Sequence, residues 1–389
     1  MHEEIPMTEA DATDQDVAPV TATGTTTGPT RTGTKTGPTS RDAAPARTRS
    51  GGVRTEGLRK SFGDDEVIKG VDIEVEPGTI VGLIGPSGCG KTTTVRLMTG
   101  LLRPTAGSAT VFGTESCSLT AKQRARIGYL PQTPALFPEL SLGENLSFHA
   151  SMYGMRFRRR DRLDQLLDWV ELSDHRSKRV VDASGGMQRR LALAAAFVHD
   201  PDVVFLDEPT AGIDPILRDK LWTRFHDVAD AGRSLVVTTQ YVGEAGQCDL
   251  VGLLSDGELL LLDTPTNLRR AAFDGEVVDV QLDRPLTDAE LTQLSDEPFV
   301  LGQIERTGPT GLRFVVDDAG HAMQLIGDAL HRSDASIVEI DEHLVDYDEA
   351  FLRVVQRHRT SSGATDEPDR LDRPAAAGDR SDHDMEAAR

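Results

Sequence analysis

The stretch that decides the fold runs from residue 79 to residue 93 and reads Thr79-Ile80-Val81-Gly82-Leu83-Ile84-Gly85-Pro86-Ser87-Gly88-Cys89-Gly90-Lys91-Thr92-Thr93. Its first six residues are mostly apolar and predict a buried strand, and we expect a helix from Lys91 to Leu102. The segment between them has the pattern G-x-x-x-x-G-K-T in the strand–loop–helix context that this pattern requires. The sequence therefore predicts a loop that binds phosphate groups.

The residue types in this loop suit phosphate binding. Glycine lets backbone N–H groups turn toward phosphate oxygens in conformations that a Cβ atom would obstruct, and the helix start adds positive potential. Lys91 is expected to reach the β and γ phosphates, and the Thr92 hydroxyl to bind Mg²⁺. Cys89 could serve as a redox switch, but any small residue fits there, and we favour that simpler interpretation. The predicted nucleotide-binding residues of the loop are Gly85, Pro86, Ser87, Gly88, Cys89, Gly90, Lys91, Thr92 and Thr93.

An acidic pair, Asp207-Glu208, follows a second apolar run at Val203–Leu206. The carboxyl ends of parallel strands are where open α/β sheets bind ligands. Asp207 is predicted to hold Mg²⁺ through water, and Glu208 to act as general base toward an attacking water. Alone, such a pair is more often a solvated strand end. We expect its strand to lie adjacent to the strand that leads into the phosphate loop, which favours the functional interpretation.

Further apolar runs alternate with helical patterns. A strand is expected at Leu235–Thr238, a hairpin around Asp256-Gly257 and a helix over Ser184–His199. This alternation predicts an α/β fold with a parallel sheet covered on both faces. From about residue 277 the pattern changes to strands at 277–282, 312–316 and 336–340 with a helix at 320–332, which predicts a small α+β appendage.

The low-complexity ends are predicted to be disordered. Between Thr21 and Ser40, ten of twenty residues are Thr, too few of them apolar to offset chain entropy. The predicted organisation is a disordered tail at 1–52, an α/β domain with the phosphate loop at 53–270, a small α+β domain at 271–357, and a disordered acidic tail at 358–389.

Composition narrows the function. The 389 residues carry a net charge of −21, which argues against a nucleic-acid partner because phosphate backbones need clustered cations. Only 7 of the 42 basic residues are Lys, a balance that suggests a halophile protein, although ordinary acidity with acidic tails explains it as well. Three cysteines rule out a disulfide framework and indicate the cytoplasm. No apolar run reaches the length of a membrane helix, so a membrane function would need another chain.

Four further motifs surround these elements. They are Ala183-Ser184-Gly185-Gly186-Met187-Gln188-Arg189-Arg190, Gln132 in Leu130-Pro131-Gln132, Ala211-Gly212-Ile213-Asp214-Pro215, and Phe62. Together with the phosphate loop and the acidic pair, they resemble the signature motif, Q-loop, D-loop and adenine-stacking aromatic of ATP-binding cassette (ABC) ATPases, over about residues 53–268. The resemblance implies a P-loop NTPase fold that binds ATP and Mg²⁺. It implies that the domain at 53–270 is an ABC ATPase domain with a helical subdomain at about 133–182. It also implies nucleotide contacts from Phe62, Gln132 and Asp214, with Gln132 contributing to the metal site.

The signature segment has its own physical logic. Ser184 can cap the following helix, while Gly185 and Gly186 leave the helix N-terminus bare, which makes an anion site. In the family, this site closes over the γ-phosphate bound by a second ATPase subunit, so the resemblance implies a homodimer with two ATP molecules sandwiched head to tail.

Two positions depart from the family pattern. Ala183 stands where Leu is usual, and we expect a small packing effect. Gln240 stands where the family usually has the switch His. Gln can donate a hydrogen bond to the γ-phosphate but cannot carry a proton. The alternatives are a tolerated substitution or an ATPase held slow, and we favour the first. The expected catalytic residues are thus Glu208, Lys91 and Gln240.

Residues 238–245, the signature and Asp346–Phe351 resemble multidrug or daunorubicin-type export ATPases. This implies an ATP-hydrolysing subunit, peripheral on the inner face of the cell membrane, that drives an integral-membrane permease on a separate chain. An importer ATPase of the same fold and a non-transport protein acting on ribosomes or DNA are the alternatives. Phe137, Leu140, Leu142 and Phe148 would shape a groove for the permease, or simply pack in the core. A basic run, Arg156, Arg158, Arg159, Arg160 and Arg162, could contact lipid or permease but is more often a solvated helix face.

Overall fold

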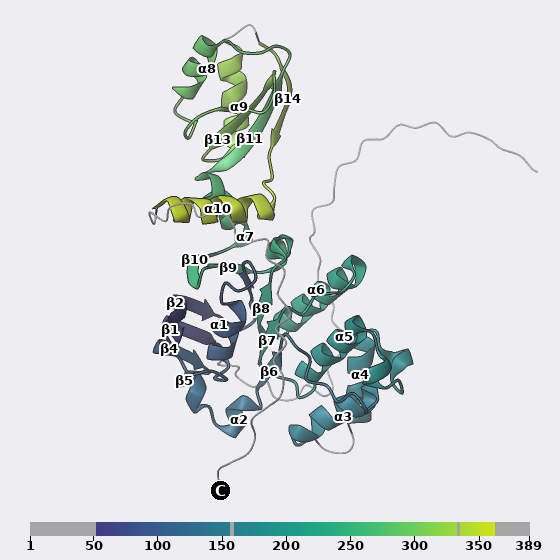
Figure 1. Ribbon diagram of the computed structural model, residues 1–389. Helices are drawn as coiled ribbons and strands as arrows, with labels where there is room; N and C mark the ends of the chain where they lie inside the picture. The colour runs from purple at the N-terminus through teal and green to yellow at the C-terminus, as the bar shows by residue number, and fades with distance from the viewer. Residues whose placement is uncertain (1–51, 156–158, 333–334, 362–389) are drawn as a thin grey trace, which may run out of the picture. The chain divides into compact units, whose positions relative to one another are not determined.

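The computed structural model describes residues 52–155, 159–332 and 335–361. Its central sheet has six strands, all parallel except the edge strand β10 (Figure 1). In spatial order they are β10 (Glu258–Asp263), β9 (Leu250–Ser255), β3 (Ile80–Ile84), β8 (Ser234–Thr239), β7 (Val203–Asp207) and β6 (Ile127–Leu130). The predicted hairpin at Asp256-Gly257 is the β9–β10 turn.

Both faces of this sheet are buried, but they are covered differently. Alternate residues of a strand point to opposite faces. Ile80 and Ile84 of β3 share a core with the helices on one side, whereas Val81 and Leu83 share a second core with α1 and an antiparallel sheet. That sheet was not anticipated from the sequence. Its strands, in spatial order, are β2 (Asp65–Val75), β1 (Val53–Phe62), β4 (Ala106–Val111) and β5 (Thr114–Glu115).

The strand order corrects one expectation. The strand of the acidic pair, β7, does not lie adjacent to β3, because β8 is inserted between them. Parallel strands joined by crossover helices need not be neighbours in chain order. The insertion places Thr238 of β8 between the phosphate loop and Asp207, and this residue proves important for the site.

Helices connect and cover the strands. The helix after the phosphate loop ends at Met98 rather than Leu102, because Gly100 has a φ of 72° and a Cβ there would collide with the Ser116 carbonyl. The α-helices of the ATPase region are α1 (Lys91–Met98), α2 (Ala121–Arg124), α3 (Leu142–Met152), α4 (Arg160–Trp169), α5 (Gly185–Ala196), α6 (Pro215–Asp230) and α7 (Pro265–Phe273). The 3₁₀ turns are η1 (Ser116–Ser118), η2 (Ser173–His175), η3 (Val180–Asp182) and η4 (Val242–Gln247).

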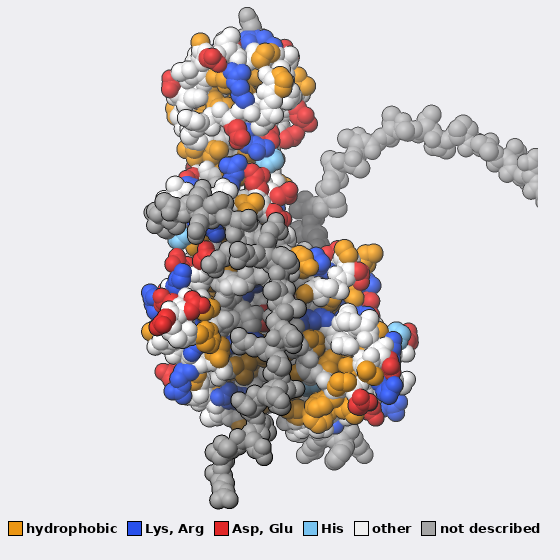
Figure 2. Space-filling view, in the orientation of Figure 1, with side chains coloured by type: hydrophobic (Ala, Val, Ile, Leu, Met, Phe, Trp, Pro, Cys, Tyr) orange, Lys and Arg blue, Asp and Glu red, His pale blue; other side chains and the backbone are white. Residues whose placement is uncertain are grey.

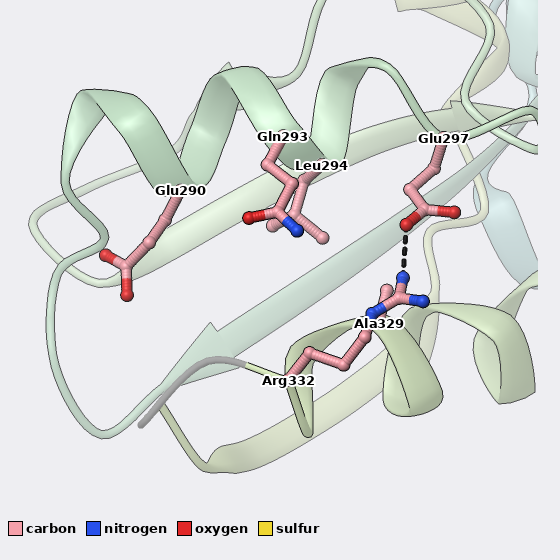
Figure 3. Close-up of a pocket in the computed structure, with 6 residues that line it drawn as sticks. All are labelled: Glu290, Gln293, Leu294, Glu297, Ala329 and Arg332. Carbon is pink, nitrogen blue, oxygen red and sulfur yellow. Dashed lines mark hydrogen bonds and ion pairs between the residues drawn. The ribbon is translucent and has the colours of Figure 1, made fainter.

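A third, antiparallel sheet has its own hydrophobic core with α8 (Asp288–Ser295) and α9 (Ala319–Leu330). In spatial order its strands are β12 (Glu305–Arg306), β13 (Gly311–Val316), β11 (Glu276–Leu282) and β14 (Ile337–Glu342). Figure 3 shows a cavity between α8 and α9, beside the ion pair of Glu297 and Arg332. Its volume of about 20 Å³ suits about one water molecule, and no motif residue lines it.

The last described helix, α10 (Tyr347–Ser361), corrects the predicted start of the C-terminal tail at residue 358. Tyr347, Phe351, Val354 and Val355 follow helical spacing and pack against the core of the ATPase region. His358 lies 3.1 Å from a carboxylate oxygen of Glu258. The charged residues between these positions concealed the apolar stripe. The predictions of disorder for residues 1–51 and 362–389 lie outside the described residues.

Candidate nucleotide site

The phosphate loop lies between β3 and α1, as predicted. Gly88 and Gly90 have φ angles of 82° and 108°, a region that favours glycine. A Cβ at Gly85 would collide with the Leu254 carbonyl, so that glycine is required by space rather than by angle. Gly90 forms the N-cap of α1 without a side-chain hydrogen bond, which leaves the first N–H groups of this helix without a side-chain cap.

Lys91 and Cys89 show how the loop is organised inside. The Lys91 side chain is buried, and its Nζ donates hydrogen bonds to the carbonyls of Gly85 at 2.7 Å and Pro86 at 2.9 Å. The ammonium group is therefore held within the loop by the backbone. Burial raises the pKa of the Cys89 thiol, only partly offset by Lys91. A protonated, buried thiol reacts poorly, which favours the packing interpretation of Cys89.

A buried corner joins the phosphate loop to the acidic strand. The Thr92 hydroxyl donates to Asp207 Oδ1 at 3.0 Å, and the Thr238 hydroxyl donates to the same oxygen at 2.6 Å. Asp207 is fully buried, and its Oδ2 has no hydrogen-bond partner among the described residues. A hydroxyl beside an unsatisfied carboxylate oxygen is the kind of donor set that Mg²⁺ prefers. The residues present fit the predicted ion.

Glu208 adopts a backbone conformation that is unusual for its residue type. Its φ is 53°, in the left-handed region, which costs about 1–3 kcal/mol for a residue with a Cβ. Its N–H donates to both the carbonyl and the hydroxyl of Thr238, each at 3.0 Å. These two hydrogen bonds hold the residue just beyond the end of the strand, at the edge where the phosphate loop also lies.

The signature segment is exposed at the start of α5. Ser184 caps the helix by accepting a hydrogen bond from the Met187 N–H at 3.3 Å. A Cβ on Gly185 would meet no atom within 4 Å, and one on Gly186 would meet only the Gly212 carbonyl at 3.7 Å. Within the described residues, no hydrogen bond links this segment to the phosphate loop. The bare helix end therefore faces open space beside the D-loop.

The remaining predicted residues lie at the ends of strands and helices. Gln132 is exposed two residues after β6, and Gln240 is exposed directly after β8. Asp214 caps α6 by accepting from the Leu217 N–H at 3.0 Å. Phe62 ends β1 with 49% of its surface exposed and Lys60 Nζ 5.0 Å from its ring centre. An aromatic face available for stacking is thus present, while Ala183 is buried as a small core residue.

Sequence reasoning missed two residues, Thr238 and Arg189. Arg189 lies in the quoted signature but received no role, although its guanidinium is buried and bonds to backbone carbonyls on both sides of the corner. The sequence contains one indication of a role for Arg189, because it is an arginine in a helix whose following residues, such as Leu191 and Ala192, are apolar and buried. For Thr238, the indication is a hydroxyl side chain in a strand that is buried along its whole length.

Residues 68–211 match the family model described as ABC transporter. The daunorubicin/doxorubicin resistance ATP-binding protein DrrA of Streptomyces peucetius is 32% identical over 317 residues, which cover 81% of this chain and 95% of that protein. This chain belongs to the ATP-binding proteins of ABC transporters. The family, the P-loop NTPase fold and the resemblance to ATP-binding proteins of the drug-resistance type are thereby confirmed.

Two more comparisons define the extent of the match. The probable multidrug ABC transporter ATP-binding protein YbhF of Escherichia coli is 35% identical over 233 residues, 60% of this chain. The chain spans only 40% of the length of that relative. A solved ATP-binding subunit of an ABC transporter aligns with a TM-score of 0.52 at 28% identity, over 56% of this chain and 92% of that structure. A dimeric ATP-binding cassette with ADP and phosphate bound aligns with a TM-score of 0.52 at 25% identity, over 55% and 98%.

Proposed function

We propose that this chain is the ATP-hydrolysing subunit of an ABC exporter and that it drives a permease on a separate chain. The observation that carries the proposal is the corner where the Thr92 hydroxyl donates to Asp207 Oδ1 at 3.0 Å. The other carboxylate oxygen, Oδ2, has no hydrogen-bond partner among the described residues. This corner lies directly beside the loop that holds Lys91. Together, the loop and the corner offer the Lys91 cation, the Thr92–Asp207 pair as metal ligands, and the carboxylate of Glu208. These are the groups that phosphoryl transfer to water requires.

Each residue has a defined task in this proposal. The phosphate loop and Lys91 bind the β and γ phosphates of ATP, and Phe62 stacks under the adenine. Mg²⁺ held by Thr92, Asp207 and Gln132 would neutralise charge on the phosphates. Glu208 accepts a proton from the attacking water, and Gln240 donates a hydrogen bond to the γ-phosphate. Asp214 orders the D-loop through its helix cap and lies close to the nucleotide of the opposite site.

We further propose that two copies close head to tail over two ATP molecules. The exposed helix start at Ser184–Gly186 supports this arrangement, because it presents N–H groups and the first turn of α5 holds no acidic residue. The similarity to a dimeric cassette with ADP and phosphate bound is consistent with it. Each site would then combine the phosphate loop of one copy with the signature of the other.

The permease contact is proposed for the segment around α3. Hydrophobic side chains gather over this region in Figure 2. Phe137 and Phe148 are exposed by 43% and 39% and pack edge to face at 4.4 Å, and Met152 is exposed by 68%. Leu142, in contrast, is fully buried and belongs to the core, and Leu140 is half-buried. No described helix is both long and apolar enough to cross a membrane.

The basic run is not needed for this contact. Arg159 donates to the carbonyl and hydroxyl of Ser147, and Arg162 donates to the Phe197 carbonyl at 2.9 Å. Arg160 is the exposed member of the described part and lies 3.6 Å from Asp164. These bonds favour a structural role in joining helices. Arg156 and Arg158 lie outside the described residues.

The decisive experiment is the Glu208→Gln variant of the full chain. Because Gln cannot accept the proton, we expect MgATP turnover to fall by about 10²–10⁴-fold while ATP still binds. ATP should then trap a dimer, measured by size-exclusion chromatography with light scattering. Glu139→Gln, an exposed glutamate outside the site, is the matched control and should behave like the wild type. Unchanged turnover in Glu208→Gln would remove this residue from its proposed role.

The direction of transport is tested separately, with the permease present. Loading of substrate into inside-out vesicles that contain both chains is expected for an exporter. ATP-dependent transport in the opposite direction would indicate the importer alternative. Stable association with ribosomes and no stimulation by any membrane protein would instead support the non-transport alternative.

A further inference from the structure

Arg189 is a buried arginine whose guanidinium is bonded to backbone carbonyls from two separate segments. Only 6% of its surface is exposed. Nη1 donates to the carbonyls of Pro131 at 2.9 Å and Gln132 at 2.6 Å. Nη2 donates to the Glu208 carbonyl at 2.6 Å and also to the Asp207 carbonyl. One side chain on the signature helix α5 thus satisfies four carbonyls at the carboxyl edge of the sheet.

The two segments would otherwise diverge. Strands β6 and β7 are paired in parallel, and their last paired residues are Leu130 and Leu206. The β6–β7 ladder ends at this pair, although Asp207 is still paired with Thr238 of β8. Carbonyls beyond this pair that have no partner in the ladder need other donors. A guanidinium offers five N–H groups in a rigid fork, whereas an ammonium is a point donor with three. Arg189 therefore ties the Q-loop and the catalytic carboxylates to α5.

These bonds act on the proposed general base. Glu208 sits in a strained left-handed conformation, and its N–H donates to both the carbonyl oxygen and the hydroxyl oxygen of Thr238. Its carbonyl is held by Arg189. The peptide groups on both sides of the strained residue are thus fixed, which sets the direction in which the carboxylate leaves the backbone. Strained residues persist only where the surroundings over-determine them.

The same side chain fixes the start of the Q-loop. Because the Gln132 carbonyl accepts from Nη1, the position from which the Gln132 side chain reaches the metal site is set relative to Glu208. We propose that Arg189 is a positioning residue for ATP hydrolysis. Through four backbone carbonyls it aligns Glu208 and Gln132, and it couples them to the signature helix. This inference rests on the proposed ATPase function.

The neighbouring arginine provides a matched control. Arg190 also lies on α5 and also donates to two backbone carbonyls, those of Val170 at 3.0 Å and Glu171 at 3.1 Å. Its partners are far along the chain from the corner and touch neither the Q-loop nor the acidic pair. An effect caused by losing an arginine from this helix in general should therefore appear equally in Arg190 variants.

The test compares Arg189→Lys, Arg189→Met and Arg190→Lys in the full chain. If Arg189→Lys misplaces Glu208 without changing the affinity for nucleotide, kcat should fall about tenfold or more. KM and the Kd for MgATP should stay within about threefold of the wild type. Arg189→Met should lose more, and Arg190→Lys should stay within about twofold. If Arg189→Met does not fold by thermal unfolding, Arg189→Lys alone carries the comparison.

A double-mutant cycle with Glu208→Gln separates positioning from a merely structural role. If Arg189 acts by aligning Glu208, adding Arg189→Lys to Glu208→Gln should lower the residual turnover by less than about twofold. A full, multiplicative loss in that background would overturn the inference, as would a wild-type kcat in Arg189→Lys or an equal loss in Arg190→Lys. A wild-type chain without MgATP turnover would instead refute the proposed function itself, before any variant is compared.

Discussion

The corner around Asp207 and the signature segment at Ser184–Gly186 are both proposed to bind charged groups, Mg²⁺ at the corner and phosphate at the signature. The two regions differ in burial and in how their polar groups are bonded. The corner is buried and closed by hydrogen bonds from Thr92 and Thr238 within one chain. The signature presents a capped helix start with open space where the Cβ atoms of its glycines would lie. The groups of the corner all come from one copy, whereas the glycines of the signature have no close side-chain contact among the described residues.

This difference indicates the step at which a second copy would enter the proposed reaction. The buried corner would need only nucleotide and metal to complete it, so a single copy should bind MgATP. In the proposed dimer, the open helix end contributes only when a second copy brings its own phosphates to it. Binding and turnover should therefore respond differently to damage in the two regions, and variants in each region test this.

Among variants that remove a group from only one of these two regions, Asp207→Asn should have the largest effect. The amide can still accept the hydrogen bonds from Thr92 and Thr238, so the fold should persist, but the charge that holds Mg²⁺ is lost. We expect turnover to fall by about 10³-fold, since metal stabilisation of phosphoryl transfer is worth several kcal/mol. MgATP binding to the single copy should weaken as well, measured by isothermal titration calorimetry. The exposed Asp168→Asn serves as control, and normal MgATP binding in Asp207→Asn would contradict the assignment of the corner.

The next effect, about 10²-fold, is expected from Gly186→Asp. A carboxylate at the bare helix end should repel the γ-phosphate of the second copy and keep it away from the N–H donors of the helix. Loss of one preorganised donor of this kind costs about 10²–10³-fold in turnover. Because the phosphate loop is untouched, MgATP binding to a single copy should stay within about threefold. Equal losses in binding and turnover would show that the two regions do not act on different copies.

Mixing two defective variants tests whether each site combines groups from two copies. A chain with Lys91→Ala combined with a chain with Gly186→Asp can form a mixed dimer in which both defects fall on one site and the other is intact. Random pairing should restore turnover to at most about a quarter of the wild-type value, because half of the dimers are mixed and one of their two sites works. If mixing restored no turnover beyond that of the two variants alone, the head-to-tail arrangement would be contradicted, because sites built within one copy would each keep a defect.

Sequence alone predicted the corner better than its surroundings. The phosphate loop, Asp207 and Glu208 carry their chemistry in their residue types and spacing, so their location could be read from the pattern. The position of β8 between β3 and β7 could not be, because strand order depends on how crossover helices pack and not on the strands themselves. Thr238 was missed for this reason, since its importance comes only from that position.

The other omissions have similar physical causes. Arg189 resembles any charged residue at a helix position until the four carbonyls around it are seen. The antiparallel sheet β2-β1-β4-β5 has mixed polar and apolar residues, because one of its faces is exposed, and its strands lack a strong apolar run. The helix α10 was hidden by its charges. Features that depend on distant parts of the chain meeting in space left the weakest pattern in the sequence.

The smallest effect is expected where the residues that follow α3 and α5 meet strand β6 of the central sheet, away from both the corner and the signature. His199 lies 3.0 Å from the Ile127 carbonyl and stacks on Tyr153 with ring centres 3.6 Å apart. Burial lowers the pKa of His199, and it also lowers the pKa of His149. The unfolded chain therefore takes up protons before the folded one as the pH falls below the ordinary histidine range. Stability present above about pH 6.5 should be lost toward pH 5.

The variant that tests this is His199→Gln, whose amide can keep the hydrogen bond to Ile127 without titrating. We expect the fall in Tm between pH 7 and pH 5 to be smaller in the variant than in the wild type, with His149 accounting for part of the remainder. His175→Gln, a histidine in the turn η2, is the control for the loss of one imidazole from this part of the chain. An unchanged slope in His199→Gln would show that protonation of His199 does not disturb its contacts with Ile127 and Tyr153, and would contradict the assignment of this pH dependence to His199.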